Sequence, residues 1–284
     1  MALPSSPKRP NISAGNKMPW QVTYTQPENA STPRTCSYGW VPDRPDKRDV
    51  CYRPPRKLLG ALPPSVDLRP HCPPIYRQGT LNSCTAQAIA AAIEFEQLKQ
   101  GLPERFLPSR LFIYYNERAA ERTIATDSGA GIRSGIKTVA KRGVCPETMW
   151  AYRIRKFRER PLHPCYSHAA NYRGVSYRRV RRRLPALKAC LASGYPFIFG
   201  FIVHRSLHAP EVTRTGRGEM PLKHDPILAG HAVLAVGYDD SEERFILRNS
   251  WGRKWALEGY FTLPYDYLMT PHLSQDFWTI RLIS

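Results

Sequence analysis

The stretch RQGTLNSCTAQAIAAAIEFEQ, residues 77–97, decides the fold of this chain. A polar, glycine-containing loop gives way at Cys84 to an alanine-rich segment in which apolar side chains recur at helical spacing. The spacing predicts a helix over residues 84–100 that ends at Gly101. A cysteine at the start of a helix is either a buried structural thiol or a nucleophile, because the positive end of the helix dipole stabilises a thiolate.

Further helices are predicted downstream. Residues 109–122 and residues 131–143, the latter closed by Gly143, have apolar side chains at helical spacing. Residues 180–194 place leucines on one face and stop at Gly194.

The pattern changes after this last helix. Short apolar or alternating runs, broken by glycine and aspartate, predict strands over residues 196–204, 231–240, 244–252 and 259–267. Helices first and strands later indicate an α+β protein whose two halves meet at a cleft, a common place for a ligand.

The composition suits one large domain or two halves, since the chain has 284 residues of which 42% are hydrophobic. The net charge of +19 favours acidic partners, such as nucleic acid, anionic membrane surfaces or acidic proteins. No apolar run is long enough to span a membrane, and the N-terminus lacks the apolar core of a secretory signal. We therefore expect a protein that is cytoplasmic or exported by a non-classical route.

The strongest basic run consists of Arg178, Arg179, Arg181, Arg182 and Arg183, at the start of the last predicted helix. One interpretation is a polyanion or nucleotide site, because arginine binds phosphate oxygens bidentately. The other, which we favour, is a solvated helix face, although positive charge at a helix N-terminus opposes the dipole. The sequence has no glycine-rich phosphate-binding loop of the common types.

Residues 1–60 form a basic, proline-rich extension with too few apolar clusters to fold independently. This extension is either an unfolded leader or a segment that wraps the domain, as its aromatic residues suggest. These aromatic residues are Trp20, Tyr24, Tyr38, Trp40 and Tyr52. We expect the globular domain over residues 61–284, with a helical half at about 61–175 and a β-rich half at about 176–284.

Seven cysteines leave at least one thiol unpaired: Cys36, Cys51, Cys72, Cys84, Cys145, Cys165 and Cys190. The one cluster that resembles a metal site is HPCYSH, with His163, Cys165 and His168. Three possible ligands without a fourth nearby are more typical of a loop, so we expect neither a metal nor a cofactor.

A histidine that accepts the proton of Cys84 would be a second means of holding it as a thiolate. His231 is the best candidate, because it opens an apolar strand directly after Gly230 and so could face a cleft. Asn249 ends the next strand and could orient the imidazole, and Trp251 could shield that hydrogen bond from water.

Attack on a carbonyl also requires donors for the oxyanion that develops. The backbone N–H of Cys84 and the side-chain amide of Gln78 are available, with Gly79 between them allowing a tight bend. Nucleophile, base, orienting residue and oxyanion donor are therefore all present.

The order of these residues, together with two short motifs, resembles the papain family of cysteine peptidases in its bacterial branch. The motifs are NSWG at residues 249–252 and GY at residues 259–260, with Trp255 between them. The resemblance extends from about residue 62 to residue 261. It implies a papain-like fold in which the cleft separates a helical half from an antiparallel, barrel-like β half.

The resemblance also implies a role for each residue. Gln78 would help to form the oxyanion hole, Cys84 would be the nucleophile, His231 the base and Asn249 its orienting partner. The implied activity is a thiol protease that hydrolyses peptide bonds through an acyl-enzyme, with peptides or proteins as substrates. The alternative is a polyanion- or nucleotide-binding protein on this fold, with peptidase activity secondary.

Two departures from the family pattern lie beside Cys84. Leu81 stands where the family usually has a disulfide-forming cysteine, so that bridge should be absent. Thr85 stands where the family usually has an aromatic residue. Both change the surroundings of the site without removing a catalytic group.

The resemblance further implies where a substrate would bind. In this family a glycine-rich stretch hydrogen-bonds the peptide backbone, and Gly129 and Ala130 are its counterpart here, unless residues 126–135 are only a loop that enters a helix. Gly230 and Trp251 should line the same groove.

Family members are usually zymogens with a long helical propeptide, for which the extension here is too rich in proline. The segment YGWVPDRPDKRD, residues 38–49, is similar to what bacterial members carry before the catalytic domain. We hypothesise that part of residues 1–60 lies over or near the cleft and limits access to it.

Overall fold

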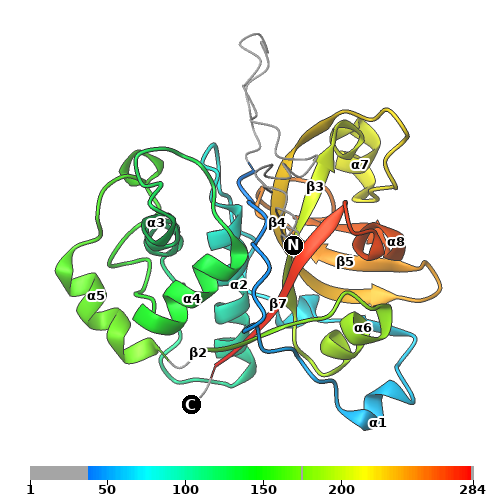
Figure 1. Ribbon diagram of the computed structural model, residues 1–284, viewed down its shortest axis with the longest axis horizontal. Coiled ribbons are helices and arrows are strands. Elements are labelled where there is room, and N and C mark those ends of the chain that lie inside the picture. The colour runs from blue at the N-terminus through cyan, green and yellow to red at the C-terminus, as the bar shows by residue number, and fades with distance from the viewer. Residues whose placement is uncertain (1–37, 174, 283–284) are drawn as a thin grey trace, which may run out of the picture. The chain divides into compact units, whose positions relative to one another are not determined.

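In the computed structural model, residues 38–173 and 175–282 are described, and all of them belong to one compact unit that spans residues 34–284. Within this unit, a group of helices lies beside a β-sheet that carries helices of its own (Figure 1). No helix among the described residues is long and apolar enough to cross a membrane.

The helices α2 to α5 form the helical half, while α1 and α6 to α8 lie on the side of the sheet (Figure 1). Their bounds are α1 Arg56–Leu59, α2 Cys84–Lys99, α3 Arg110–Glu121, α4 Ile132–Arg142, α5 His163–Ala169, α6 Leu184–Ala192, α7 Pro210–Thr215 and α8 Tyr265–Met269. The predicted helices over residues 84–100, 109–122 and 131–143 are confirmed as α2, α3 and α4. Ser109 caps α3 by accepting a hydrogen bond from the N–H of Phe112.

Seven strands form one antiparallel sheet in the order β2-β7-β3-β4-β5-β6, and β1 pairs with β4 off this path. Their bounds are β1 Ser65–Asp67, β2 Val175–Arg179, β3 Phe197–His204, β4 Ile227–Asp239, β5 Arg244–Arg248, β6 Tyr260–Pro264 and β7 Ser274–Leu282. The four predicted strands are confirmed as β3 to β6. The described strands form an open sheet and not a closed barrel.

The last predicted helix begins later than expected. Arg178 and Arg179 lie in strand β2, which pairs with β7, and α6 begins only at Leu184, with a proline in its first turn. The prediction that the arginine run starts this helix is therefore wrong. Strands β2 and β7 were both missed, and β1 joins the sheet from within the stretch expected to be helical.

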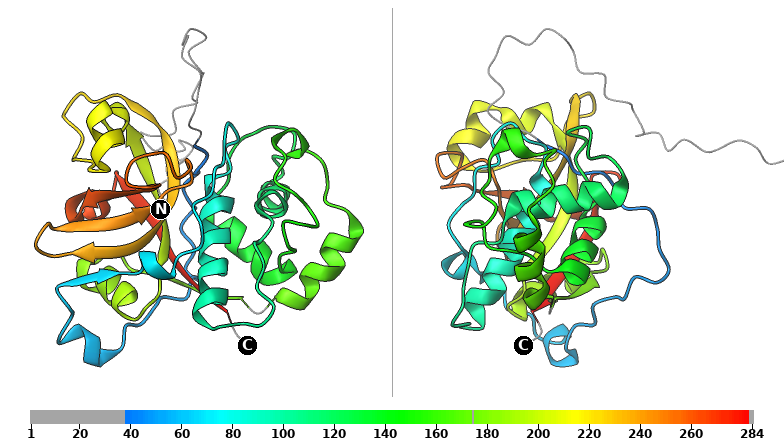
Figure 2. Two further views of the ribbon diagram at one scale, coloured as in Figure 1. Left: turned by 180° about the vertical axis from the view of Figure 1, so that it is seen from behind. Right: turned by 90° about the vertical axis from the view of Figure 1, so that its left-hand side faces the viewer.

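Helix α2 is the element that joins the two halves. It is buried over most of its length, between β4 on one side and the helices α3 and α4 on the other (Figure 2). Alanine at five of its positions lets these neighbours approach closely. Because α2 is held on both sides, the position of its first residue, Cys84, is fixed relative to the sheet.

Each half has its own hydrophobic core. The core of the helical half extends across α2 onto one face of the sheet, and the second core, rich in phenylalanine, fills the other face. Leu81 is buried in the first core. All six cysteines in the described part of the chain are free, and Cys36 lies outside the described residues.

Replacing Phe199 with alanine should lower the free energy of unfolding by about 3–5 kcal/mol, because the substitution leaves a cavity in the second core. Phe199 is fully buried and stacks on Phe277, with ring centroids 5.5 Å apart. Urea denaturation followed by circular dichroism would measure the change. The control is Leu222→Ala, since Leu222 is 81% exposed, and an equal loss in both variants would contradict the assignment of this core.

Candidate active site

Cys84 is the first residue of α2 and is completely buried. Its Sγ accepts a hydrogen bond of 3.3 Å from the backbone N–H of Ala232 in β4. Burial raises the pKa of the Cys84 thiol, and backbone N–H groups, that of Ala232 first, oppose the rise. The thiol therefore lies at the positive end of a helix and touches the sheet, in surroundings that exclude water.

His231, the residue before Ala232, is also completely buried, and its Nε2 lies 2.9 Å from Oδ1 of Asn249. The backbone N–H of Ser250 donates to the same Oδ1 at 2.8 Å, which identifies that atom as the acceptor oxygen. Nε2 of His231 must therefore carry the proton, which leaves Nδ1 as the basic nitrogen of the neutral ring.

Nδ1 of His231 is buried and has no hydrogen-bond partner among the described residues. Burial lowers the pKa of His231 to about 4, and the bond to Asn249 opposes this change. Burial therefore favours the neutral form of both the imidazole and the Cys84 thiol.

Gln78 is buried in the loop before α2, and three bonds hold it there. Its Nε2 donates to the carbonyl of Leu81 at 3.0 Å, and its Oε1 accepts from the Ser250 hydroxyl at 2.6 Å. Its backbone carbonyl accepts from the hydroxyl of Tyr152 at 2.9 Å. Ser250 therefore bonds both to the predicted oxyanion donor and to the orienting residue, a role that the sequence reasoning missed although Ser250 lies within NSWG.

Trp251 stacks on the imidazole of His231, with ring centroids 4.9 Å apart. The indole therefore lies against the imidazole whose Nε2 is bonded to Asn249. His208, which the sequence reasoning did not select, stacks on Trp251 from another side at 5.3 Å. No motif marks His208 in the sequence, because it lies in the short turn between β3 and α7.

The predicted substrate groove is filled by residues 38–52 of the chain itself, which we call the strap. The N–H groups of Gly39 and Trp40 both donate to the carbonyl of Gly230 at 3.1 Å. On the other side, Ala130 donates to the carbonyl of Gly39 at 2.8 Å and accepts from Val41 at 3.0 Å. In Figure 1 the strap is the dark blue segment that runs between the two halves.

Glycines allow this close approach. A Cβ on Gly129 would lie 2.0 Å from the carbonyl oxygen of Gly39, and a Cβ on Gly39 would lie 2.0 Å from the carbonyl oxygen of Asn82. Both glycines have positive φ, which a larger residue adopts only with strain. The expected groove residue Gly129 therefore gives room to a backbone, although here that backbone belongs to the strap.

Tyr38 covers His231. Its ring packs edge-on against His231 and against Trp251, each with centroids 6.1 Å apart. Its hydroxyl lies 2.7 Å from Nε2 of His208. The buried state of His231 thus depends partly on the strap.

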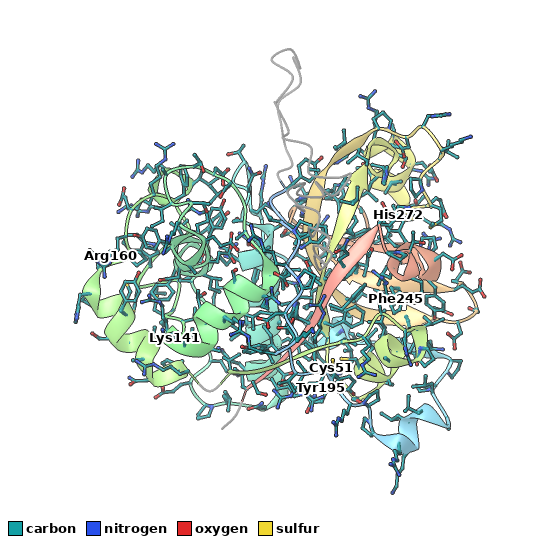
Figure 3. All side chains as sticks on the ribbon, viewed as in Figure 1. Cys51, Lys141, Arg160, Tyr195, Phe245 and His272 are labelled. Carbon is teal, nitrogen blue, oxygen red and sulfur yellow. The ribbon has the colours of Figure 1, made fainter. Side chains whose placement is uncertain are left out.

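The rest of the strap is fixed by ion pairs and by a short stretch of backbone pairing. Asp49 accepts from Arg133 at 2.8 Å and from Arg179 at 3.0 Å. Tyr52 donates from its backbone to the carbonyl of Arg179 at 2.8 Å. Cys51, labelled in Figure 3, marks this end of the strap beside β2.

The arginine run is partly used inside the molecule. Arg179 pairs with Asp49, and Arg182 donates to the carbonyl of Ser274 at 3.0 Å. A polyanion or nucleotide ligand therefore stays a prediction from charge. His163, Cys165 and His168 lie in α5, and among the described residues no group of three possible ligands could hold a metal ion.

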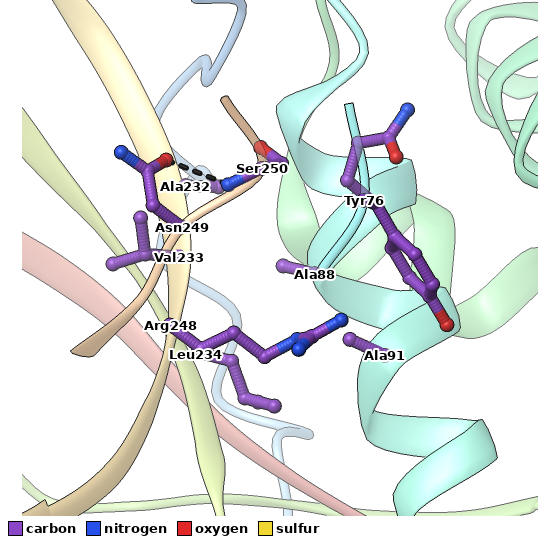
Figure 4. Close-up of a pocket in the computed structure, with 10 residues that line it drawn as sticks. Tyr76, Ala88, Ala91, Ala232, Val233, Leu234, Arg248, Asn249 and Ser250 are labelled. Carbon is purple, nitrogen blue, oxygen red and sulfur yellow. Dashed lines mark hydrogen bonds between the residues drawn. The ribbon is translucent and has the colours of Figure 1, made fainter. Parts of the chain in front are cut away.

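A small cavity lies behind the site, between α2 and β4 (Figure 4). The guanidinium of Arg248 crosses it to donate to the carbonyls of Pro73 and Pro74 at 2.7 and 2.6 Å, and lies over the ring of Tyr76. Because Arg248 immediately precedes Asn249, these bonds also hold the end of β5 in position.

Comparison with known proteins assigns the chain to a family of enzymes. The family model described as "Papain family cysteine protease" matches residues 62–272. The chain belongs to the papain family of cysteine proteases. It is therefore a hydrolase that acts on peptides or proteins.

Solved and sequenced relatives of this papain-family chain agree. Xylellain, a cysteine protease from Xylella fastidiosa, is 43% identical with a TM-score of 0.83, over 90% of this chain and 100% of that one. An uncharacterized peptidase C1-like protein of Acanthamoeba polyphaga mimivirus is 42% identical over 87% of this chain and 88% of its own. A procathepsin B from Trypanosoma congolense, 15% identical with a TM-score of 0.69 over 88% and 87%, shares the fold.

Replacing Gln78 with alanine should lower kcat about 10²–10³-fold, because it removes one donor from the oxyanion hole. Peptide hydrolysis would measure kcat, and active-site titration would correct for the amount of competent enzyme. The matched control is Gln100→Ala, since Gln100 is exposed and its side-chain amide donates to the carbonyl of Leu282. Equal kcat in the Gln78 variant and the control would exclude this role.

Proposed function

We propose that the chain is a cysteine endopeptidase that works through a thiolate–imidazolium pair and an acyl-enzyme. Cys84 attacks the peptide carbonyl. The oxyanion that forms accepts hydrogen bonds from the backbone N–H of Cys84 and from the side-chain amide of Gln78. His231 gives its Nδ1 proton to the leaving amine, which leaves a thioester on Sγ. Water then attacks the thioester, His231 accepts its proton, and the thiolate departs.

The observation that carries this proposal is the state of His231. Asn249 holds the proton on Nε2, so the basic Nδ1 is free to accept the proton of a thiol. An unpaired buried nitrogen is costly, so Nδ1 of His231 is in a state that favours accepting a proton.

Labelling with a thiol-directed epoxide inhibitor tests the proposal. We expect labelling to completion and peptide hydrolysis in the parent chain, both slowed by the strap that covers the groove, and neither in Cys84→Ala. The control is Cys190→Ala, which removes another fully buried thiol, in α6. Hydrolysis that persists in Cys84→Ala would overturn the proposal.

We further propose that the strap makes the enzyme latent, as zymogens of the family are. Support comes from its bonds to Ala130 and Gly230, which are the backbone groups that an extended substrate would use. Tyr38 also lies against His231, where a substrate would have to pass.

Latency has an electrostatic part as well as a steric one. With the strap in place, burial disfavours both charged forms of the Cys84–His231 pair, since an ion loses its hydration there. Release of the strap would readmit water to the pair and allow the proton to move from Sγ to Nδ1.

Replacing Trp40 with alanine should raise the rate of peptide hydrolysis by about tenfold or more. The strap would lose the contacts of a buried side chain, and a loss of about 1.4 kcal/mol in the binding of the strap already corresponds to a factor of ten. The control is Val50→Ala, since Val50 belongs to the strap but is 59% exposed. Initial rates on a small peptide ester, per epoxide-titratable site, measure the effect. If the two variants and the parent had equal rates, the strap would not limit access.

The strap carries a titratable anchor at Asp43. Its carboxylate accepts from the indole of Trp278 at 3.0 Å and from the backbone of Arg133 at 3.2 Å, and its own N–H donates to Asp276 at 2.7 Å. Burial first, and then the charge of Asp276, raise the pKa of Asp43 to about 7. The guanidinium groups of Arg133 and Arg179 face this pair and oppose the rise.

The sign of the effect follows from linkage. An aspartate in a released, hydrated strap has a pKa near 4, so the bound strap retains a proton that the released strap loses. The stabilisation of the bound strap is complete below about pH 4 and is lost as the pH rises through about 7.

Hydrogen–deuterium exchange of the Val41 amide in Cys84→Ala, normalised to the intrinsic rate at each pH, should therefore accelerate between about pH 5 and 7. In Cys84→Ala/Asp43→Asn this acceleration should disappear, because the side-chain amide that replaces the Asp43 carboxyl does not titrate. Identical pH profiles in the two proteins would show that Asp43 does not control the strap.

A further inference from the structure

We propose that Asp276 sets the side-chain preference of the pocket now filled by Trp40, and that this pocket selects a tryptophan side chain of the substrate. The inference rests on the proposed function, and it concerns which peptides the site would cleave. Trp40 is 5% exposed and Asp276 is 2% exposed, so the pocket is closed around the indole.

Two glycines shape the pocket. A Cβ on Gly200 of β3 would lie 2.0 Å from Cε2 of Trp40, and a Cβ on Gly230 of β4 would lie 2.9 Å from its Cε3. Any side chain at position 200 would therefore overlap the ring. Because positions 200 and 230 have no side chain, a space remains between β3 and β4 that accommodates a planar, bicyclic group.

Asp276 provides the polar end of the pocket. Its Oδ2 accepts from Nε1 of Trp40 at 3.2 Å and from the backbone N–H of Asp43 at 2.7 Å. Its Oδ1 lies 3.5 Å from a guanidinium nitrogen of Arg179. Asp276 itself has a φ of 58°, so its backbone adopts a left-handed conformation that aspartate tolerates better than most residues.

Departure of the strap would remove both donors from Oδ2, because Trp40 and Asp43 belong to the strap. Oδ1 would keep Arg179, which is part of the body of the domain. Water would then reach Oδ2, and a substrate side chain that fills the pocket would displace this water. A substrate group that supplies an N–H avoids burying the carboxylate oxygen without a donor, and so binds more tightly than one that does not.

A substrate would reach the pocket by the same backbone contacts as the strap. The N–H and C=O of Ala130 and the carbonyl of Gly230 bind the strap on both sides of Trp40. An extended peptide that paired with these groups would direct one side chain between Gly200 and Gly230. By the family resemblance this is the second residue before the scissile bond.

Of the natural side chains, tryptophan best meets both requirements. Phenylalanine fills part of the space between the glycines but has no donor for Oδ2. Arginine and lysine have donors, but the charge of Arg179 already faces the carboxylate, so a second cation would be repelled. Tryptophan supplies a neutral N–H from a large planar ring.

The test compares peptides that differ in one residue, second before the scissile bond: tryptophan, phenylalanine or arginine. The full-length Trp40→Ala chain provides an open site, and product analysis by chromatography and mass spectrometry identifies the bond cleaved. We expect kcat/KM for the tryptophan peptide to exceed that for the phenylalanine peptide about tenfold, as for a hydrogen bond to a charged acceptor. The arginine peptide should not exceed phenylalanine.

Two further substitutions in this background separate the carboxylate from the shape of the pocket. Asp276→Gly tolerates positive φ and removes the acceptor, so the tryptophan-to-phenylalanine ratio should fall to about one. Asp276→Asn keeps an acceptor oxygen and should retain an intermediate ratio. The ratio is internal to each preparation, so partial misfolding of a variant does not alter it.

The outcomes are distinct. If no peptide were cleaved and no epoxide label entered Cys84, the proposed function itself would fail. A second outcome is cleavage with a tryptophan-to-phenylalanine ratio near one in the Trp40→Ala chain, or with a ratio that Asp276→Gly left unchanged. In either case only the assignment of Asp276 would fail. Preference for the arginine peptide would overturn the choice of tryptophan.

Discussion

The contact between the first turn of α2 and strand β4 is the constraint on which the rest of the structure depends. A single backbone N–H, that of Ala232, reaches the sulfur of Cys84 across the boundary between helices and sheet. In the mechanism that we propose, the nucleophile belongs to one half and the base to the other, so neither half would be competent alone. Alanines on α2 and tight packing against β4 keep this distance constant, and Gln78 and Asn249 are then positioned through their shared neighbour Ser250.

Much of this arrangement could be predicted from sequence. The alanine-rich segment of α2 and the short apolar runs of β4 and β5 are strong local signals. Cys84 at a helix start, His231 in one strand and Asn249 at the end of the next followed from them. The arginines of β2 could not be placed, because a basic run has no period, and their strand exists only through its pairing with β7. His208 and Asp276 were missed because the partners that give them meaning, Tyr38 and Trp40, lie 170 and 236 residues away in the sequence.

One set of backbone groups accounts for both the latency and the substrate preference that we propose. Ala130 and Gly230 hold the strap now, and they are the groups that an extended peptide would pair with. The glycines around them are therefore constrained twice, by the strap and by the substrate. Thr85, which stands where the family usually has an aromatic residue, instead donates to the buried carboxyl of Glu117 at 2.7 Å, so the packing beside the nucleophile is polar.

The strap is part of the same chain as the groove that it fills, and this continuity has a consequence for its affinity. A tethered segment experiences an effective concentration that is commonly in the millimolar range. A peptide of the strap sequence that bound the groove only weakly in free solution would thus still occupy it when attached. A single cut in the chain between the strap and the body of the domain would abolish that advantage, and dilution alone would then empty the groove.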